Sequence, residues 1–464
     1  MTSTDIDDRF RPFSDLMRAE GLPDVAIRTF GHHYAELVAG ETGQIPEGDI
    51  LPVGSVPDAD SLPADLAEAG RAALPRTVVI KLNGGLGTSM GLAKAKSLLP
   101  VRQDRSFLEI IARACAHQSV PLLLMNSFAT RAESLAALAP FWPTGVAGSL
   151  PPDFLQHKVP KIACADLSPV RYPANPALTW CPPGHGDLYP SLVSSGLLAQ
   201  LLEAGYDYAF VSNADNLGAV VDETILGHVA VGDIPFLMEV ADRTAADRKG
   251  GHLALGADGQ LLLRESAQCP AADMDAFGDI ERHRFFNTNN LWLCLSALRA
   301  QLDAGGGILT LPLIVNVKTV DPRDPGSTPV YQLETAMGAA IAAIPGSAAL
   351  RVDRSRFSPV KSTGDLLAVR SDAYLLTADH RVIVNPDRTR GPLSVALDPA
   401  HYQRIDQLDE RFPHGPPSLI DCDALDLQGD IHFGRNVSVT GKVRLAAPPG
   451  QTQIIRDDEK ILGT

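Results

Sequence analysis

The sequence predicts an α/β protein with a doubly wound, mixed but mostly parallel sheet, a helical amino-terminal arm and a small carboxyl-terminal β-helix. From Thr77 onward, short β-rich runs alternate with helical runs, which is the pattern of a sheet covered on both faces. At 464 residues, the chain is long enough for two or three domains. Near its end, the pattern changes to a period of two residues, which is typical of short strands.

Residues 1–75 are expected to form the helical arm and a linker, because helical patterns there lead into the proline- and acid-rich segment 45–63. Residues 76–375 are expected to form the main domain. Its strands are expected at 77–82, 121–126, 208–213, 234–240 and 290–295. Helices are expected between them at 105–117, 191–204 and 334–343. Ligands of such a sheet bind at the carboxyl ends of its strands.

Residues 376–464 form the third expected domain. Within it, residues 425–445 alternate apolar and polar side chains, and Gly429, Gly434 and Gly441 punctuate the alternation. This pattern predicts the short rungs of a small β-helix. An ordinary pair of hairpins is the alternative. Because the edges of such rungs are open to pairing, a homo-oligomer formed through this segment is expected.

Composition excludes several classes of protein. The net charge of −15 argues against a general nucleic-acid binder, which needs a basic face. The first residues, MTSTDIDDRF, lack the order of a signal peptide, and no apolar run approaches the roughly 20 residues that span a bilayer. The six cysteines are scattered without metal-ligand spacing. We therefore expect a cytoplasmic protein with reduced thiols and no membrane or nucleic-acid partner.

A glycine-rich loop, NGGLGTSMG, follows the strand expected at 77–82. It is not a Walker loop, because GxxxxGK followed by Ser or Thr is absent. It is one residue too long for the dinucleotide fingerprint, and the strand at 121–126 ends in Asn126 instead of an acid. These two departures argue against a nicotinamide-dependent oxidoreductase. The remaining interpretation is a loop whose amides approach a nucleotide, followed by the neutralising lysines Lys94 and Lys96.

The loop with Lys96 and Ser97 resembles the nucleotide-binding loop of the eukaryotic-type UDP-sugar pyrophosphorylases, most closely that of the UTP–glucose-1-phosphate uridylyltransferases. Further segments match the family in the same order: FLQHKVPKI, PPGHGDLYPSL, SNADNLGA, FNTNNLW, QLETAMGAAI and RSRFSPVKSTGDLL. The resemblance spans roughly residues 78–445 and includes the carboxyl-terminal segment, whose rungs it implies to be left-handed. The family usually has Gly-Pro-Lys where this chain has Lys94-Ala95-Lys96, which leaves the role of Lys94 open.

The resemblance implies a Rossmann-like nucleotidyltransferase. In the implied reaction, an oxygen of glucose 1-phosphate attacks the α-phosphorus of UTP in line, which forms UDP-glucose and releases pyrophosphate reversibly. N-acetylglucosamine 1-phosphate or a broad range of sugar phosphates is the alternative substrate. Because two polyanions must meet, the site needs cations and a metal ion more than a covalent nucleophile. A catalytically inactive nucleotide sensor is a further alternative, against which the retention of Lys96, Asp215 and Lys361 argues.

The matching motifs assign roles to individual residues. Lys96 and Lys361 are expected to be the catalytic charges on the phosphates. Asp215, just past the strand at 208–213, is expected to bind nucleotide through Mg²⁺, since that ion prefers oxygen ligands; a turn-capping aspartate is the alternative. The other expected nucleotide-binding residues are Leu82, Asn83, Gly84, Gly85, Gln156 and Gly184.

Two of these residues are expected to recognise the base. The Gln156 amide carries the donor and the acceptor that read the edge of uracil, and Gly184 lets the base approach the backbone. The expected sugar-phosphate ligands are His185, Asn213, Asn287, Asn289 and Glu334. For the asparagines, turn capping is the alternative. Lys158 and Lys161 are expected to be supporting surface charges.

Overall fold

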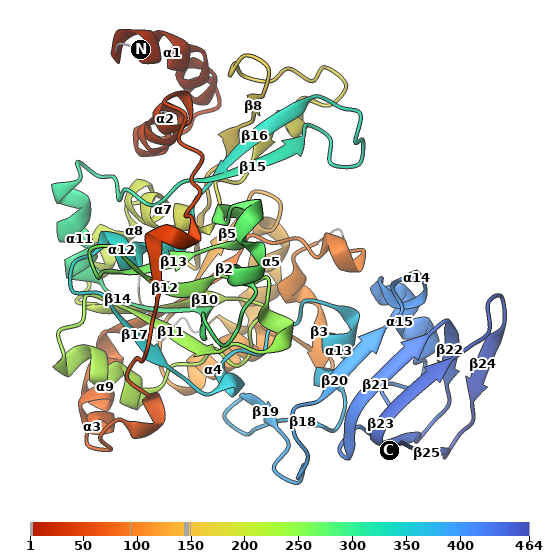
Figure 1. The fold of residues 1–464 in the computed structure, drawn as a ribbon. Coiled ribbons are helices and arrows are strands. Elements are labelled where there is room, and N and C mark those ends of the chain that lie inside the picture. Colours follow the sequence, from red (N-terminus) through yellow and green to blue (C-terminus); the bar gives the residue numbers. More distant parts are fainter. Residues whose placement is uncertain (1–2, 93, 143–147, 149, 464) are drawn as a thin grey trace.

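The computed structural model describes residues 3–92, 94–142, 148 and 150–463 (Figure 1). Its centre is a ten-stranded sheet. The five expected strands are present as β2 (Thr77–Asn83), β5 (Leu122–Asn126), β10 (Tyr208–Asn213), β11 (Phe236–Asp242) and β14 (Phe285–Cys294). The other five are β1 (Ile50–Pro52), β6 (Asp153–Leu155), β12 (His252–Gly256), β13 (Leu261–Arg264) and β17 (Ala348–Arg351).

The sheet is mixed, as expected. Strands β10, β2, β5 and β6 run parallel to one another, while β14 runs antiparallel to both β10 and β11. In the parallel half, Asn213 lies beside Leu82 and Asn83 lies beside Asn126. The carboxyl ends of β2, β5 and β10 therefore meet at one edge of the sheet, where the loops that follow them can share a ligand.

Two of the three expected helices differ from the prediction. The helix at 105–117 is present as α4 (Phe107–His117), and the Ser106 hydroxyl caps its first turn by accepting from the Glu109 N–H. The helix expected at 191–204 is two helices, α7 (Leu188–Ser194) and α8 (Leu197–Glu203). Gly196 between them has a φ of 73°, a left-handed conformation that ends an α-helix.

The predicted start of the helix at 334–343 was wrong. Glu334 is the last residue of the strand β16 (Pro329–Glu334), which pairs antiparallel with β15 (Ile314–Thr319). Helical turns begin only at Met337 and continue into α12 (Ala340–Ala343). The pairing with β15 overrides the local helical preference.

The amino-terminal arm consists of α1 (Ser3–Ala19) and α2 (Asp24–Val38), which lie beside β8 (Ile162–Ala163), β15 and β16 (Figure 1). Its apolar face shares one core with β7 (Val159–Pro160), β9 (Trp180–Cys181) and β16. The members of this core include Phe13, Met17, Ile27, Phe30, Tyr34, Val159, Cys181 and Leu333. The arm therefore supports the strand that follows Lys158, the strand that precedes Gly184 and the strand that ends at Glu334.

The segment after the arm, which was expected to be a linker, also contributes to the fold of the main domain. Strand β1 pairs with β12 and so adds an edge to the central sheet. Helix α3 (Leu66–Ala73) then packs on α9 (Glu223–Val231) at a glycine contact. A Cβ at Gly70 would lie 1.7 Å from the Glu223 carbonyl oxygen, and one at Gly227 would lie 1.9 Å from that of Leu66. Only glycine permits this approach of the two helix backbones.

The carboxyl-terminal segment is built of parallel strands (Figure 1). One sheet has the order β20 (Ser394–Leu397), β21 (Cys422–Gln428), β23 (Ser438–Ala446) and β25 (Lys460–Leu462), and a second joins β22 (Asp430–Phe433) to β24 (Thr452–Ile455). Each pairing is parallel. Hairpins would pair antiparallel, so the stacked rungs of the β-helix prediction describe this segment and the hairpin alternative does not.

Candidate functional site

A hollow of about 920 Å³ lies at the carboxyl ends of β2, β5 and β10. It lies where a parallel sheet is expected to bind its ligand. Most of the predicted site residues line it, and they come from segments far apart in the chain. They are Leu82, Asn83, Gly84, Gly85, Lys96, Gln156, Gly184, His185, Asn213 and Asp215.

The glycine loop folds back on itself at the end of β2. Leu86 and Ala95 pair as a β-bridge, and the Lys96 N–H donates to the Gly85 carbonyl at 3.3 Å. This closure returns Lys96 to the strand end. A Cβ at Gly84 would lie 2.8 Å from the Gln156 Oε1, so a larger residue there would displace that amide oxygen. Lys94 is exposed.

The predicted lysine and the predicted metal-binding carboxylate are in direct contact. The Lys96 Nζ donates to the Asp215 Oδ2 at 2.7 Å, and the side chains are only 17% and 23% exposed. Asp215 lies two residues past β10, which is the parallel neighbour of β2. The carboxylate and the ammonium thus meet inside the hollow, where partial burial strengthens charge interactions relative to bulk water.

Lys361 lies on a segment that is fixed to the Asp215 loop. The Val360 N–H donates to the Asp215 carbonyl at 3.2 Å, and Pro359 pairs with Asn216 as a β-bridge. Ser362 then caps α13 (Thr363–Arg370). The Lys361 side chain is exposed, and its ammonium lies 5.6 Å from the centre of the Phe357 ring. The structure thus places the backbone before Lys361 beside Asp215, while the Lys361 ammonium itself lies against Phe357 and near Glu265.

Two charged side chains inside apolar strands support the loop that carries Asp215. The sequence prediction included neither of them. Lys81 is buried in β2 and donates to the Ser212 Oγ and the Ala219 carbonyl at 2.6 and 2.7 Å, on either side of the Asp215 loop. Burial lowers the pKa of Lys81 to about 8. Glu239 is buried in β11 and binds Arg356 through both carboxylate oxygens, at 2.6 and 2.8 Å. A charged residue within an apolar run was the available signal, since buried charges need partners.

The hydrogen bonds around Glu239 extend to the loop that carries Asp215 and to the segment that leads to Lys361. Asn290 donates to Glu239 at 2.9 Å and accepts from Asn216 at 3.2 Å. The Asn216 amide also donates to the Arg356 carbonyl at 3.0 Å. Trp292 donates its indole N–H to the same carboxylate at 2.9 Å. One buried carboxylate therefore links the segment that carries Asp215 to the segment that leads to Lys361.

The two predicted base-reading residues touch each other. The Gln156 Nε2 donates to the Gly184 carbonyl at 3.0 Å, while its Oε1 lies beside Gly84 and accepts no hydrogen bond from the described part of the chain. Gly184 has a φ of 80°, and a Cβ there would lie 2.4 Å from the Thr335 carbonyl oxygen, so only glycine fits. Asp187, which the motif reading missed, accepts the backbone N–H of His157 at 2.7 Å and so fixes the chain next to Gln156.

His185 has a fixed tautomer. Its Nδ1 accepts the Met337 N–H at 2.9 Å, and burial lowers the pKa of the imidazole to about 4. The ring is therefore neutral near pH 7, and its Nε2–H is a donor. Glu334 lies beside Gly184, with its Cβ 3.1 Å from where a Gly184 Cβ would be. Burial raises the pKa of the Glu334 carboxyl, and a hydrogen bond with Asn316 opposes that rise.

The predicted asparagines divide into two groups. Asn213 lines the hollow. Asn287 and Asn289 lie at a bulge of β14 and bind each other: the Asn287 amide donates at 3.0 Å, and its Oδ1 accepts the Asn289 N–H at 2.9 Å. They therefore cap an irregular backbone in the way that the turn-capping alternative expected. Asn287 packs against Gly338, next to the Met337 that holds His185.

Asn83 has its side chain engaged elsewhere. It is buried, and its amide donates to Asn126 and Ser134 at 2.7 and 2.8 Å. Its backbone is thus the part that faces the hollow. Lys161 corrects the sequence prediction, because it is buried and donates to the Val320 carbonyl at 2.9 Å instead of lying at the surface.

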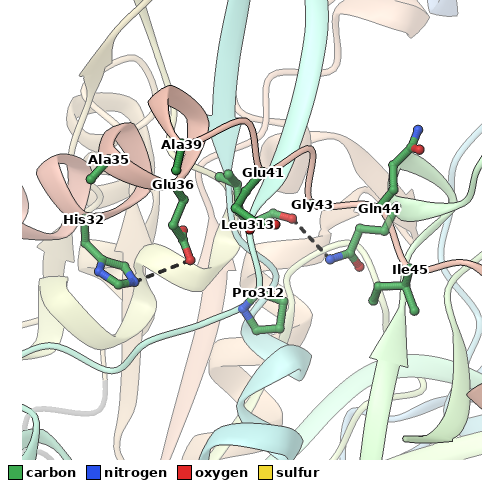
Figure 2. A pocket seen from close by; sticks show the side chains of 11 residues that line it. His32, Ala35, Glu36, Ala39, Glu41, Gly43, Gln44, Ile45, Pro312 and Leu313 are labelled. Atoms are coloured by element: carbon green, nitrogen blue, oxygen red, sulfur yellow. Dashed lines mark hydrogen bonds and ion pairs between the residues drawn. The ribbon is translucent and has the colours of Figure 1, made fainter. Parts of the chain in front are cut away.

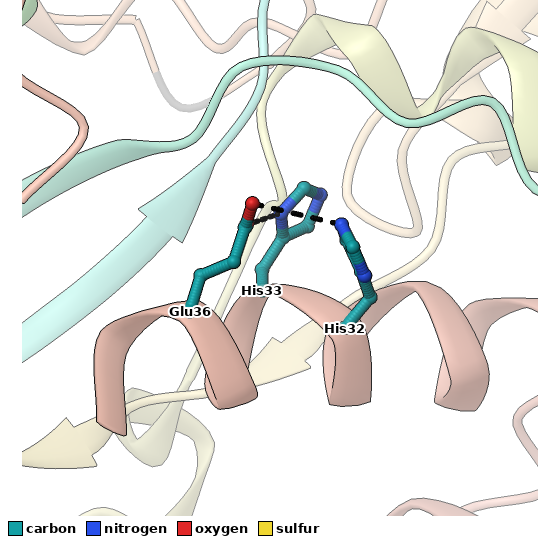
Figure 3. A group of neighbouring side chains, drawn as sticks. All are labelled: His32, His33 and Glu36. Carbon is teal, nitrogen blue, oxygen red and sulfur yellow. Dashed lines mark hydrogen bonds and ion pairs between the residues drawn. The ribbon is translucent and has the colours of Figure 1, made fainter. Parts of the chain in front are cut away.

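A second hollow, of about 570 Å³, lies between α2 and the start of β15 and contains none of the predicted residues (Figure 2). Beside it, in the described part of the chain, is one group of three possible metal ligands, His32, His33 and Glu36 (Figure 3). Its carboxylate is shared by the two imidazoles, at 3.6 and 2.9 Å. Mg²⁺ prefers oxygen ligands, so this group does not suit it, whereas the Asp215 carboxylate does.

None of the helices in the described ranges combines the length and the apolar character needed to cross a membrane.

Known proteins match most of this chain. A family model described as UTP--glucose-1-phosphate uridylyltransferase matches residues 27–440. The UTP--glucose-1-phosphate uridylyltransferase of Solanum tuberosum is 42% identical over 385 residues, which cover 81% of this chain and 78% of the relative. That of Saccharomyces cerevisiae is 38% identical, over 81% of this chain and 75% of its own. A solved structure of a mutant UDP-glucose pyrophosphorylase from Leishmania major, in complex with UDP-glucose, matches with a TM-score of 0.91 and 42% identity, covering 98% of each chain.

Proposed function

Because the chain belongs to the family of UTP–glucose-1-phosphate uridylyltransferases, we propose that it joins UTP and glucose 1-phosphate into UDP-glucose and pyrophosphate. The reaction is a reversible nucleotidyl transfer. One observation carries the assignment: a single hollow holds the Gln156–Gly184 pair at one wall and the Lys96–Asp215 pair at another. A base-reading group and a phosphate-reading group along one cavity suit a nucleoside triphosphate.

The residues of the hollow and of the segments packed beside it divide the work of the transfer. The Gln156 Oε1 accepts the N3–H of uracil, and the Gly184 backbone faces the base. Lys96 and Lys361 neutralise charge on the phosphates as it moves toward the leaving pyrophosphate. The neutral His185 donates its Nε2–H to the sugar phosphate and keeps the attacking oxygen in line with the α-phosphorus. Asn213 and Glu334 complete the sugar side, and Asn287 and Asn289, which cap the bulge of β14 through each other, support it from the backbone.

We also propose Mg²⁺ as the cofactor, held by the Asp215 carboxylate together with phosphate oxygens. This ion characteristically binds one or two carboxylates and substrate phosphates in place of an all-protein cage. Bound there, it would supply charge neutralisation to the transferring phosphoryl group. The donor chemistry supports the proposal, because Asp215 presents an oxygen ligand to the hollow beside the phosphate lysines.

The function is tested by an assay of pyrophosphate release with UTP and a series of sugar 1-phosphates. Glucose 1-phosphate should give the highest kcat/KM. A higher value with N-acetylglucosamine 1-phosphate, or similar values across the series, would move the chain to one of the alternative specificities. The reverse assay, with UDP-glucose and pyrophosphate, should regenerate UTP.

We further propose that the protein works in the cytoplasm, and that copies associate through the carboxyl-terminal β segment. The six cysteines are unpaired thiols, which fits a reducing compartment. At the end of the rungs, Ile454 and Leu462 are 72% and 77% exposed, and β25 is a terminal strand of its sheet. Light scattering should show that removing the residues after Leu408 lowers the assembled mass. An unchanged mass would refute association through this segment.

A further inference from the structure

Phe128 is an exposed aromatic side chain inside the nucleotide-binding hollow. It is 62% exposed and is the aromatic member of the exposed large hydrophobic side chains in the described ranges. It also lines the 920 Å³ hollow, as does Trp180. A large ring left in water on the wall of a binding site offers apolar area that a ligand can cover.

The position of Phe128 relates it to the base and not to the phosphates. The neighbouring Ser127 donates its hydroxyl to the Gly84 carbonyl at 3.0 Å. Gly84 is the residue that lies against the Gln156 Oε1, the acceptor for the uracil edge. Phe128 is therefore the next residue in the chain after Ser127, which binds the glycine loop where that loop contacts the Gln156 amide. Lys96 and Asp215 mark the phosphate part of the same hollow.

Lys158 ties this wall to the amino-terminal arm. Its ammonium lies 4.7 Å from the centre of the Trp180 ring and 5.8 Å from that of Phe128, within the range of cation–π attraction. The same ammonium forms an ion pair with Glu20 at 2.7 Å, just past the end of α1. Lys158 was expected to be a supporting surface charge. In the structure, it connects the arm to two aromatic rings of the hollow.

We propose that Phe128 is a nucleobase-stacking residue, and that Lys158, held by Glu20, positions the aromatic wall formed by Phe128 and Trp180. The proposal deepens the proposed function and rests on it only in that the ligand is a uridine nucleotide. Stacking uses the face of a base, which uracil and cytosine share, whereas Gln156 reads the edge, which differs between them. Phe128 therefore contributes affinity for the nucleoside and not discrimination between bases.

The first test is calorimetric titration of UMP and, separately, of pyrophosphate into the full-length protein. Phe128→Ala should weaken UMP binding about tenfold, on the scale of losing one base–aromatic stack, and should leave pyrophosphate binding unchanged. Phe128→Tyr keeps the ring and should bind UMP as the wild type does. The matched control is Ile454→Ala, which removes an exposed apolar side chain of the carboxyl-terminal segment and should change neither affinity.

Two results would overturn the stacking assignment. Normal UMP binding by Phe128→Ala would show that the ring does not cover the base. Equal weakening of UMP and pyrophosphate would show that the ring supports the hollow as a whole. The UMP measurement needs no sugar phosphate and no turnover. If the wild type binds UMP but releases no pyrophosphate from UTP and glucose 1-phosphate, the proposed function fails while the stacking result still holds.

The second test separates positioning by Lys158 from contact with the phosphates. Lys158→Met keeps the aliphatic stem but removes the ammonium, and Glu20→Gln removes the partner that holds it. Each should raise the KM for UTP about two- to fourfold and leave kcat unchanged. Each should have a smaller effect when combined with Phe128→Ala, since only the Trp180 ring then remains to be positioned. A fall in kcat for Lys158→Met would instead place its charge on the reacting phosphates and refute the positioning role.

Discussion

The Lys96 ammonium and the Asp215 carboxylate, 119 residues apart in the chain, form a 2.7 Å ion pair within the hollow. The pair joins the loop after β2 to the loop after β10, so the cation proposed for the phosphates and the carboxylate proposed for Mg²⁺ are in direct contact. Groups that share a partner contribute non-additively. The double variant Lys96→Met/Asp215→Asn should therefore lose less activity than the product of the two single losses.

Replacement of either phosphate lysine should slow the reaction. Lys96→Met and Lys361→Met should each lower kcat about 10²–10³-fold, the usual scale for losing one group that stabilises charge in the transition state. Circular dichroism should stay native, since neither side chain is fully buried. Lys442→Met, at an exposed lysine of the carboxyl-terminal segment, is the control, and its kcat should not change. Near-normal turnover of Lys361→Met would remove that lysine from the mechanism.

The metal role of Asp215 predicts a coupled loss of Mg²⁺ affinity and of rate. Asp215→Asn keeps the size and polarity of the side chain but removes its charge. A titration of Mg²⁺ against the initial rate should show both a higher half-saturating concentration and a lower maximum. An unchanged Mg²⁺ dependence in the variant would leave the carboxylate as a structural partner of Lys96 alone.

Recognition of the base predicts a preference for UTP over CTP. The Gln156 Nε2 is committed to the Gly184 carbonyl, so the Oε1 needs a donor at the N3 position of the base, where uracil has an N–H and cytosine, whose donor is the N4 amino group, has a bare nitrogen. Gln156→Ala should lower kcat/KM for UTP more than for CTP and leave the affinity for glucose 1-phosphate nearly unchanged. Equal losses with both nucleotides would show that Gln156 positions the chain and does not read the base.

His185 predicts a specific dependence of stability on pH. Burial lowers its folded pKa to about 4 from 6.5, so between these values the unfolded chain binds a proton that the folded protein does not. The stability associated with the neutral ring is present above pH 6.5 and is lost as the pH falls toward 4. Relative to His185→Gln, the unfolding free energy of the wild type should fall with decreasing pH, at up to about 1.4 kcal/mol per unit. Urea unfolding of both proteins at pH 7, 6 and 5 measures this, and parallel curves would contradict it.

The Glu239–Arg356 pair predicts a loss of stability that also reaches the site. Glu239→Gln leaves the buried guanidinium without its counter-charge, which typically costs about 3 kcal/mol or more. Denaturant unfolding should show this loss. Turnover should fall while UMP binding stays normal, because the network orders the loops of Asp215 and Lys361 and not the base wall. Native stability of the variant would show that the pair is less buried in solution.

The sequence by itself determined the elements whose pattern is local. The apolar runs show where the chain forms strands of the sheet. The glycine loop after one run and Asp215 after another show where the chain turns toward a ligand. Since the carboxyl ends of neighbouring parallel strands meet at one edge, the proximity of Lys96 and Asp215 follows from order along the chain once the sheet is assumed. The motifs around Gln156 and Gly184 likewise anticipated two residues that the structure joins by a hydrogen bond.

Tertiary structure alone decided the features that depend on a distant partner. Glu334 begins a segment with helical preference, yet it ends a strand because β15 supplies the pairing. Lys161 looks like a surface lysine, but the carbonyl of Val320, 159 residues away, accepts a hydrogen bond from its ammonium in the interior. Lys158 meets Glu20 across 138 residues because the arm packs its apolar face on the strands beside it. Such contacts are set by how packed faces meet in space, and the local periodicity of a segment carries no record of them.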